Sequence, residues 1–391
     1  MKGQIVKLIY QTFLPDQGRY PRVSGQAKIL LRGGFDVTVL ACDREARHRT
    51  REVVEGVKVE RIPVKTGEMR GPFLQLLPLA LFWLKTVRWV FSHSFDVLHC
   101  HNLDVLFVGW LVKQRKSCPV VFDAHEPNYY ALWPRKWGPF LKLIDMFETF
   151  FARRVDIVTV TNEYQVNKYK KLGVKRVELV GNYPLPHLRT DELLEEKFDR
   201  QALTFGRLGT IYDHAGFEET LIAFQRVQRD YPNTRLLIGG RIVKKYEKMF
   251  RSLIAPVEDH VEYIGPYSAE KMSRIYKRID VSILIYPKSE WFRNITPRKF
   301  FDSVANGVPV IITDIGGLGE VVKRNKCGLL VEEKDIDTIT QAMIKTLENG
   351  NARKRMASNA LKLAQTEYNW KSMAAKYVDI QEALISRAKS R

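Results

Sequence analysis

The stretch WFRNITPRKFFDSVANGVPVIITD, from Trp291 to Asp314, changes character twice within a short distance. A polar loop containing Pro297 leads into a short run with helical character. The sequence ANGVP then breaks this run before an apolar segment rich in β-branched residues. A helix followed by a buried strand is the repeating unit of α/β proteins. The stretch therefore predicts a short helix followed by a strand.

Similar apolar runs recur along the chain, separated by stretches long enough for a helix or a crossover. Parallel strands that are buried on both faces have sequences of this kind. The pattern stops in a Pro- and acid-rich interval at residues 182–200 and then starts again, which predicts two doubly wound, Rossmann-like domains. The expected strands are QIVKLIY, FDVTVLAC, VKVERIPV, FDVLHCH, CPVVFDAH and VDIVTVTN in the first half, and LTFGRLG, TRLLIGG, VEYIGP, VSILIYP, PVIITD and CGLLVEE in the second.

Three helices are expected after Glu333: DIDTITQAMIKTLENG, ARKRMASNALKLAQTEY and WKSMAAKYVDIQEALISRA. Open α/β sheets bind ligands beyond the carboxyl ends of their strands. Two such domains facing each other would therefore form a ligand-binding cleft between them.

The composition is that of a folded protein with an excess of positive charge. Hydrophobic residues make up 45% of the 391 positions and charged residues 27%, which are ordinary values. The formal charge of +19 favours anionic partners. Zinc-finger spacing, an RNA-binding aromatic signature and a helix-turn-helix are all missing from the sequence. We therefore expect no nucleic acid partner, and we favour a nucleotide ligand or an anionic membrane surface.

The cysteines and the apolar stretches bear on location. The four cysteines are scattered without a CxxC pair, and the first residues lack the pattern of a secretory signal, which favours a reducing cytoplasm. The longest apolar stretch, PFLQLLPLALFWLKTVRWVF at residues 72–91, is interrupted by Gln, Pro, Lys and Arg. We therefore expect no transmembrane helix.

The sequence TFGRLG places Gly206, Arg207 and Gly209 directly after an expected strand and before a helical pattern. Backbone N–H groups and a guanidinium could together bind a diphosphate. Glycines after strands are more often only turns. The segment predicts an anion site only in combination with a second basic element.

The opening stretch supplies such an element. Pro297 suits the start of a helix, and the free N–H groups beyond it, together with Lys299, could bind the same anion. Asp302 lies one turn further on. It is either an acceptor for ribose hydroxyls or a solvated residue near the positive end of the helix dipole.

The sequence FDAHEPNYY presents Asp123, His125 and Glu126 after another expected strand. A histidine there could bond a substrate hydroxyl or transfer a proton, or it could be satisfied by a nearby carbonyl.

Two motifs resemble metal sites, and we expect neither to bind a metal. HCHNLD contains His99, His101 and Asp104, but a third ligand at a recognisable spacing is missing. Asp335 and Asp337 match a DxD pattern, but they open an expected helix, so helix capping is the better interpretation.

Taken in order, these motifs resemble the retaining glycosyltransferases of family 4, the glycosyl transferases group 1, which have the GT-B fold of two Rossmann-like domains. The resemblance covers nearly the whole chain. YPRVSGQAKILLRGGFDVTVL is similar to the N-terminal loop and helix of a subgroup with Pro-Arg-Val, and the Asp-Ala-His-Glu motif of VVFDAHE fits the same subgroup. The other matching segments are DVLHCHNLD, VTVTNEY, FGRLG, LLIGG, VEYIGP, DVSILIYP, PRKFFDSVANGVPVIITDIGGLGEVV and CGLLVEEKD.

The resemblance implies an acceptor-side domain at residues 1–185, completed by a C-terminal helix at 370–391, and a donor domain at 186–369. It also implies roles for single residues. The catalytic residues would be His125 at the donor sugar, Arg207 and Lys299 at the diphosphate, and Asn294. The donor-binding set would be Gly206, Gly209, Tyr263, Ile264, Thr296, Pro297, Arg298 and Asp302. A loop with Gly18, Arg19 and Arg22 would lie near the donor phosphates or the acceptor.

The chain departs from the family pattern at two positions. Asn294 replaces the first of two acids, and Ala215 replaces a Lys or Arg, whose charge His214, Arg293 or Lys299 would have to supply. These departures leave open a second hypothesis, a catalytically weakened sugar-nucleotide-binding subunit. A nucleotide-dependent oxidoreductase is less favoured, because IYQTFLPDQGRY stands where GxGxxG would follow the first strand.

The implied reaction moves a sugar from a UDP- or GDP-linked donor to an acceptor hydroxyl with retention, without a metal or another cofactor. Two stretches mix Trp, Phe and Leu with Lys and Arg, at residues 72–91 and 129–154. They could bind a membrane interface or pack in the interior. With the positive charge, they favour peripheral binding to the inner face of the plasma membrane. The acceptor would then be a lipid-linked or membrane-proximal glycan in cell-surface polysaccharide or glycoconjugate synthesis.

Overall fold

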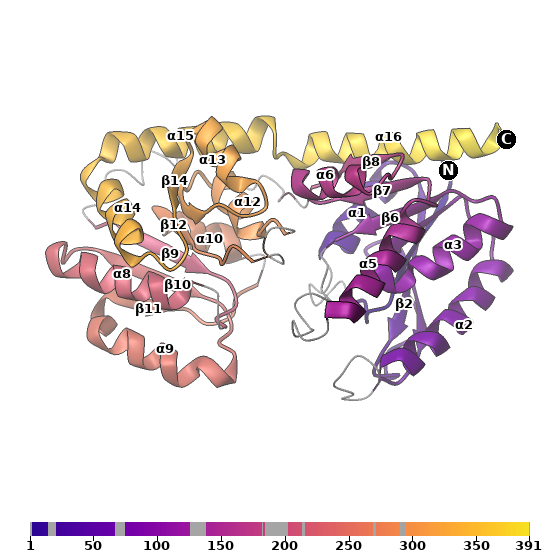
Figure 1. Ribbon diagram of the computed structural model, residues 1–391, viewed down its shortest axis with the longest axis horizontal. Coiled ribbons are helices and arrows are strands. Elements are labelled where there is room, and N and C mark those ends of the chain that lie inside the picture. The colour runs from indigo at the N-terminus through magenta and orange to yellow at the C-terminus, as the bar shows by residue number, and fades with distance from the viewer. Residues whose placement is uncertain are drawn as a thin grey trace. The chain divides into compact units, whose positions relative to one another are not determined.

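The computed structural model describes residues 2–14, 21–66, 75–125, 138–181, 183, 202–212, 216–268, 271–289, 292 and 295–390. The chain divides into two compact units (Figure 1). Unit 1 comprises Met1–Asn182 and Ser372–Arg391, and unit 2 comprises Tyr183–Lys371. The chain passes between the units within a few residues of the expected boundaries at 185 and 369.

Unit 1 contains an eight-stranded sheet with the order β3-β4-β2-β1-β5-β6-β7-β8. Its strands pair in parallel, except for the antiparallel edge pair of β3 and β4. The six expected strands are present. The sequence did not predict β3, which is polar and exposed, or β8, which has only three residues. The strands are β1 (Gln4–Ile9), β2 (Asp36–Asp43), β3 (Arg51–Val54), β4 (Val57–Pro63), β5 (Val97–His101), β6 (Val120–Ala124), β7 (Ile157–Val160) and β8 (Val177–Leu179).

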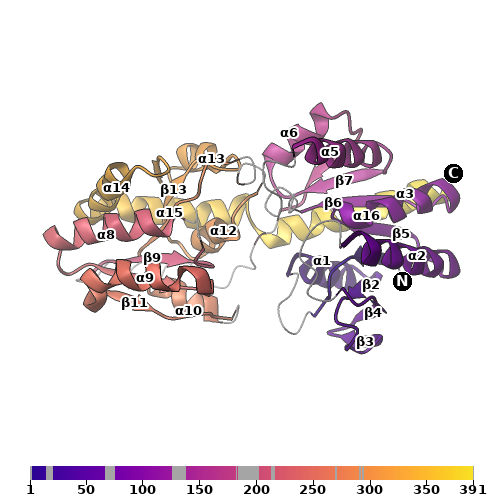
Figure 2. The same ribbon diagram turned by 60° about the horizontal axis from the view of Figure 1, so that its bottom comes forward.

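Successive side chains of these strands face two different helix layers, because the side-chain period of a strand is two. One face carries an apolar core under α2 (Leu76–Ser92), α3 (Leu106–Arg115), α5 (Gly138–Ala152) and α6 (Glu163–Lys171). The other face lies against α1 (Pro21–Arg32) and α16 (Trp370–Lys389) (Figures 1 and 2). The C-terminal helix therefore packs on the first unit, although it is the last element of the chain.

Unit 2 contains a six-stranded sheet, parallel throughout, with the order β11-β10-β9-β12-β13-β14. All six strands were expected from the sequence. They are β9 (Thr204–Leu208), β10 (Arg235–Gly239), β11 (Val261–Tyr263), β12 (Val281–Leu284), β13 (Val310–Thr313) and β14 (Gly328–Val331). This open parallel sheet is of the doubly wound kind, as in unit 1.

Helices cover both faces of the second sheet (Figures 1 and 2). One apolar core lies under α8 (Phe217–Asp230), α9 (Glu247–Ile254) and α14 (Ile336–Glu348), and a smaller core on the opposite face includes α10 (Met272–Lys277). The remaining helices are α12 (Arg298–Ala305), α13 (Leu318–Asn325) and α15 (Gly350–Thr366). The three helices expected after Glu333 are α14, α15 and α16. In the part of the chain that the structure describes, no helix is both long enough and apolar enough to cross a membrane.

The opening stretch of the sequence forms α12 and β13. Pro297 was expected in the first turn of the helix. It is instead the N-cap residue, and the helix begins at Arg298. The helix ends at Ala305, and Gly307, two residues later, has a φ of +61° in the left-handed region. The N–H groups of Gly307 and Val308 donate to Val304 and Ser303 carbonyls, a common way to close a helix. The break at ANGVP is therefore a helix stop followed by a strand.

Candidate active site

Glycines bring three strand ends of unit 2 close together. The Gly209 N–H donates to the Gly239 carbonyl, and the Gly240 N–H donates to the Gly265 carbonyl, both at 2.8 Å. A Cβ at Gly240 would lie 1.8 Å from the Gly209 carbonyl oxygen, so a larger residue does not fit. Gly206 is a packing residue, because a Cβ there would lie 2.5 Å from the Ile279 side chain.

Arg207 lies at the end of β9 with 1% of its surface exposed. Its guanidinium lies 4.5 Å from the ring centre of Phe217 and 5.1 Å from that of Tyr286. Its Nη1 donates to the Leu208 carbonyl at 3.2 Å. The two rings and the burial hold the guanidinium in place by cation–π contact.

The start of α12 lies in the same unit as Arg207 and offers hydrogen-bond donors. Pro297 makes no side-chain cap. The Phe300 N–H donates to the Pro297 carbonyl at 3.0 Å, so the helix-start donors that have no acceptor within the helix are the N–H groups of Arg298 and Lys299. The buried hydroxyl of Thr296 has no partner among the described residues. The Gly316 turn, with φ of +56°, packs against this segment, because a Cβ there would lie 2.2 Å from the Ile295 carbonyl oxygen. The segment therefore holds unsatisfied polar groups in a fixed backbone.

Basic side chains and Asp302 complete this helix start. Asp302 is 2% exposed, and its oxygens lie 3.4 Å from Lys299 Nζ and 3.5 Å from Arg298 Nε. Burial alone would lower the pKa of Lys299, but the Asp302 carboxylate and Tyr267 outweigh it and raise the pKa. Lys299 is therefore a cation at neutral pH. Asp302 is a buried ion-pair partner, so the interpretation as a solvated helix residue was wrong.

Tyr263 and Ile264 lie at the end of β11. The Tyr263 hydroxyl donates to the Gly240 carbonyl at 2.7 Å, and its ring is partly exposed. Ile264 packs against the smaller apolar core. Both therefore lie next to the glycine-linked strand ends.

A row of polar side chains crosses unit 1 on the face of α1 and α16. Asp123 on β6 is fully buried and accepts two hydrogen bonds from Arg22, at 2.6 and 3.1 Å. Gln26 and Thr159 also donate to its carboxylate, at 3.0 and 2.7 Å. Burial alone would raise the pKa of Asp123, but Arg22 and the neighbouring histidines hold it well below its usual range. Asp123 is therefore ionised.

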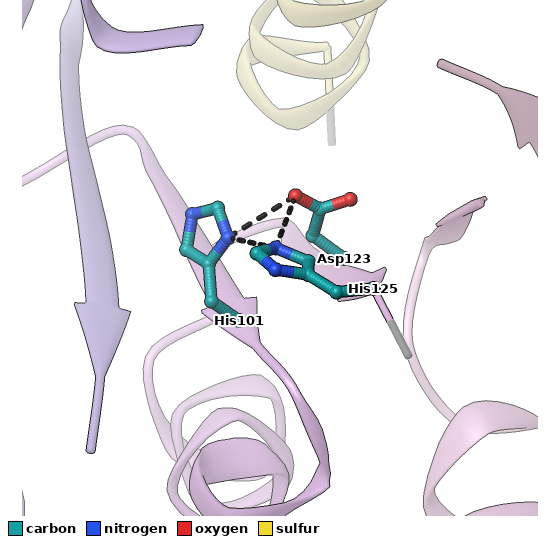
Figure 3. Close-up of side chains that lie close together, drawn as sticks. All are labelled: His101, Asp123 and His125. Atoms are coloured by element: carbon teal, nitrogen blue, oxygen red, sulfur yellow. Dashed lines mark hydrogen bonds and ion pairs between the residues drawn. The ribbon is translucent and has the colours of Figure 1, made fainter. Parts of the chain in front are cut away.

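Two histidines converge on the same carboxylate (Figure 3). Asp123 Oδ2 lies 3.1 Å from His101 Nδ1 and 3.0 Å from His125 Nε2, and these two nitrogens are 2.9 Å apart. The His125 side chain is 15% exposed, whereas His101 and Asp123 are fully buried. Burial lowers the pKa of His125, and the charges of Arg22 and Lys7 lower it further. The Asp123 carboxylate raises this pKa, but by less. His125 is thus a neutral, oriented imidazole that reaches the surface of its unit.

His101, Asp123 and His125 are close enough to serve as metal ligands, a grouping that the spacing of HCHNLD did not predict. His99 instead bonds to Gln381 on α16, and burial raises the pKa of the separate Asp104 carboxyl to about 7. The surroundings of the cluster do not suit a cation, because Arg22 already pairs with Asp123 and Lys7 Nζ lies 3.2 Å from His101 Nε2. We therefore assign the cluster to hydrogen bonding.

Several candidate residues lie outside the described part of the chain, and their roles stay predictions. They are Gly18, Arg19, Glu126, His214, Ala215, Arg293 and Asn294. Arg22 lies in the described part of the chain. Its guanidinium donates hydrogen bonds to the Asp123 carboxylate and to the Val180 carbonyl, each at 2.6 Å. The sequence analysis did not single out Lys7, Gln26, Thr159 or Tyr377. Lys7 could have been found as a single charge within the apolar run QIVKLI.

The Asp335 carboxylate accepts a hydrogen bond from the Thr338 N–H at 3.0 Å. It is the N-cap of α14. The capping interpretation of the DxD pattern is therefore confirmed.

Two doubly wound domains of parallel strands, with polar groups gathered at strand ends, place the chain in the GT-B class of glycosyltransferases. Comparisons with known proteins carry this further. The family model for glycosyl transferases group 1 matches residues 191–363, and the model for the glycosyl transferase 4-like domain matches residues 18–182. Because these models match successive parts of the chain, the protein is a group 1 glycosyltransferase.

Individual relatives are distant but similar over their full length. Phosphatidyl-myo-inositol mannosyltransferase of Mycolicibacterium smegmatis is 22% identical over 363 residues, which are 92% of this chain and 88% of the relative. Sucrose-phosphate synthase of Thermosynechococcus elongatus has a TM-score of 0.79 at 16% identity, covering 98% of this chain and 100% of its own. Anabaena HepE, solved with UDP and glucose, has a TM-score of 0.71 at 13% identity, covering 97% and 99%.

Proposed function

We propose that this glycosyltransferase transfers a sugar from a UDP- or GDP-linked donor to an acceptor hydroxyl. The observation that carries the proposal is the start of α12, where the first backbone N–H groups, the Thr296 hydroxyl without a partner among the described residues and the Lys299 cation are close in sequence. A helix start with adjacent positive charge suits a diphosphate. The UDP and UDP-glucose complexes of Anabaena HepE support the same donor class.

The proposed mechanism places positive groups where negative charge grows on the departing diphosphate. Arg207, Lys299 and the α12 N–H groups supply these charges, and stabilisation of a leaving group is the main task in this chemistry. We propose that the chain needs no metal or other cofactor for it. His125 contacts the donor sugar, Asp302 and Tyr263 lie on the nucleoside side, and Asn294 acts near the sugar. The acceptor hydroxyl attacks the sugar from the same face from which the diphosphate departs, so the configuration is retained. The resemblance to the subgroup with Pro-Arg-Val and Asp-Ala-His-Glu motifs implies this outcome.

Ligand binding tests the donor proposal directly. A ligand that binds only the folded state raises the melting temperature of the protein. We expect UDP or GDP, and one of their sugar conjugates, to raise the Tm in a thermal-shift screen, with inorganic phosphate as the control. If no nucleoside diphosphate raised the Tm above that control, the donor proposal would be wrong.

We further propose that the acceptor is lipid-linked or membrane-proximal and that unit 1 binds the inner face of the plasma membrane from the cytoplasm. The outer surfaces of α2 and α5 carry exposed apolar side chains, with Leu77 69%, Leu84 70% and Met146 66% exposed. Exposed basic residues, including Arg88 and Arg154, flank them. The two helices lie in one layer with α3 between them. An apolar and basic face of this kind suits an anionic lipid surface.

Vesicle binding tests the membrane proposal. We expect the protein to sediment with vesicles that contain an anionic lipid and to be released in 1 M salt, where the Debye length falls to about 3 Å. The double variant Leu77→Ser, Leu84→Ser should bind vesicles about tenfold more weakly or worse, because it loses the transfer of two leucine side chains from water into the lipid interface. Val53→Ser is the matched control, since Val53 on β3 is 67% exposed outside this face. Equal binding to neutral and anionic vesicles would contradict the proposal.

A further inference from the structure

The polar row of unit 1 continues from Asp123 to a buried lysine. Lys7 lies on β1 with no surface exposure. Its Nζ donates to Gln26 Oε1 at 2.8 Å and to the Tyr377 hydroxyl at 3.0 Å, and it lies 3.2 Å from His101 Nε2. Two of these atoms are oxygen acceptors and the third is a ring nitrogen, a set of three neighbours that suits the three donors of an ammonium group. The geometry therefore describes a charged Lys7.

A charged Lys7 determines where the proton of His101 lies. An ammonium group has no lone pair, so His101 Nε2 must accept its hydrogen bond, and the neutral ring then carries its proton on Nδ1. Burial lowers the pKa of His101 to about 3, and the Lys7 charge acts in the same direction, so the ring is neutral. Its Nδ1–H lies 3.1 Å from Asp123 Oδ2 and donates to it.

The same carboxylate determines the proton of His125. His125 Nε2 lies 3.0 Å from the Asp123 anion and 2.9 Å from His101 Nδ1, whose proton is directed to the same carboxylate. An N–H on His125 Nε2 gains a charge-assisted hydrogen bond to Asp123, and this tautomer has its lone pair on His125 Nδ1. This Nδ1 has no hydrogen bond to any other described residue. Because His125 reaches the surface of its unit, that lone pair is available to a hydroxyl group of a bound ligand.

We propose that Lys7 is a positioning residue for His125: its ammonium group fixes the tautomer of His101 and keeps both imidazoles uncharged, so that His125 accepts a hydrogen bond from a donor-sugar hydroxyl. This proposal rests on the proposed function, in which His125 contacts the sugar. Without Lys7, one positive charge beside the two rings is lost. A proton then binds the rings more readily, and a protonated His125 donates at Nδ1 where the lone pair was.

Several charged and titratable groups on the described elements face the two histidines and influence their protonation. They are Lys7 on β1, Arg22 on α1, His99 and His101 on β5, Asp123 and His125 at β6, and Tyr377 on α16. Burial lowers the pKa of Lys7 itself to about 7, with Asp123 opposing this and Arg22 adding to it. Lys7 is therefore charged below neutral pH, which is the range in which the histidines would take up a proton.

The imidazoles of the full chain can be observed without any substrate. With ¹⁵N-labelled histidine and His125→Gln for assignment, NMR should show His125 of the wild type as the neutral Nε2–H tautomer at pH 6. In Lys7→Met, the titration of the His125 or His101 ring should move upward by about one pH unit or more, since a unit charge at this distance acts through a buried medium. An Nδ1–H tautomer in the wild type, or unchanged titration in Lys7→Met, would overturn the proposal.

The pH dependence of kcat/KM gives the functional readout. The acid limb of Lys7→Met should move upward by about the same amount, whereas a packing defect alone would lower kcat/KM at every pH. If the Met variant does not fold, Lys7→Gln replaces it and is expected to shift the acid limb in the same direction. Lys7→Arg keeps the charge and is expected to leave the acid limb near its wild-type position. Lys28→Met is the control, because Lys28 on α1 is exposed and pairs with Glu55. An acid limb that stays in place in the folded Met or Gln variant would contradict the proposal.

The two readouts separate this proposal from the proposed function. If the wild type turned over no nucleoside diphosphate sugar, the proposed function would fail, while the imidazole spectra would still decide the role of Lys7. If transfer occurred with an unshifted acid limb, the function would stand and the role of Lys7 would fall.

Discussion

Replacing Lys299 by Met is expected to lower kcat by about a hundredfold to a thousandfold, the usual cost of removing one group that stabilises charge in a transition state. Lys299 is 19% exposed and lies at the start of α12, where the diphosphate is proposed to bind. The Asp302 carboxylate holds its ammonium group and raises its pKa against the effect of burial. The cation is therefore present throughout the working pH range and should act mainly on the departing diphosphate.

Steady-state kinetics with the donor identified by thermal shift would measure this effect. Lys299→Arg keeps the charge and should retain part of the activity. Lys323→Met is a matched control on α13, because Lys323 is an exposed lysine of the same unit. The Tm of each variant shows whether a loss of activity reflects unfolding. A kcat for Lys299→Met within a few fold of the wild type, in a folded protein, would remove Lys299 from the proposed mechanism.

Replacing Asp123 by Asn is expected to lower the free energy of unfolding of unit 1 by about 3–5 kcal/mol, because it leaves the buried Arg22 guanidinium without its counter-charge. The carboxylate accepts hydrogen bonds from Arg22, Gln26 and Thr159, in addition to the two histidines. An amide at this position can accept fewer of them and presents two donors of its own to the surrounding donors.

Urea unfolding followed by tryptophan fluorescence would measure this loss, since Trp83, Trp89 and Trp110 lie in unit 1. Thr159→Val is the control. It removes one hydrogen bond from an uncharged donor to the same carboxylate and should cost about 1.5–3 kcal/mol, less than the loss of the counter-charge. A loss below about 1 kcal/mol for Asp123→Asn would show that the polar row does not depend on charge.

The pH dependence of the same measurement has a definite sign. The pKa of Asp123 in the folded protein lies well below its usual value, whereas an unfolded Asp titrates near about 3.9. Its contribution to stability is therefore present above about pH 4 and is lost as the pH falls toward the folded-state pKa. The difference in stability between the wild type and Asp123→Asn should shrink as the pH falls through this range.

The fold was largely predictable from the sequence because its signals are local. Among the strands in the described part of the chain, twelve of fourteen coincide with short runs of Val, Ile and Leu that burial on both faces requires. The two exceptions have physical reasons. β3 alternates exposed and partly buried residues at a sheet edge, and β8 has three partly buried residues. The polar composition of one and the shortness of the other left no apolar run to detect.

The candidate site was predictable only in part. Arg207, Lys299 and Asp302 could be selected because each stands beside a strand end or helix start in the sequence. Their state could not be predicted. Arg207 lies next to the rings of Phe217 and Tyr286, which come from other elements. The two cations beside Asp302 are on its own helix, but its burial depends on the packing of that helix in the unit.

By itself the sequence determined two parallel-sheet domains, the helix start after Thr296 and the closing helices, since each depends on side chains only a few positions apart. Only the tertiary structure decided the polar row of unit 1. Lys7 and Tyr377 are 370 positions apart, and Arg22 and Asp123 are 101 apart. Pairing of β1 with β5 and of β5 with β6, together with the packing of α16, places these groups on one buried face. The hydrogen-bond partners of His101 and His125 therefore come from several elements and exist only once that face is assembled.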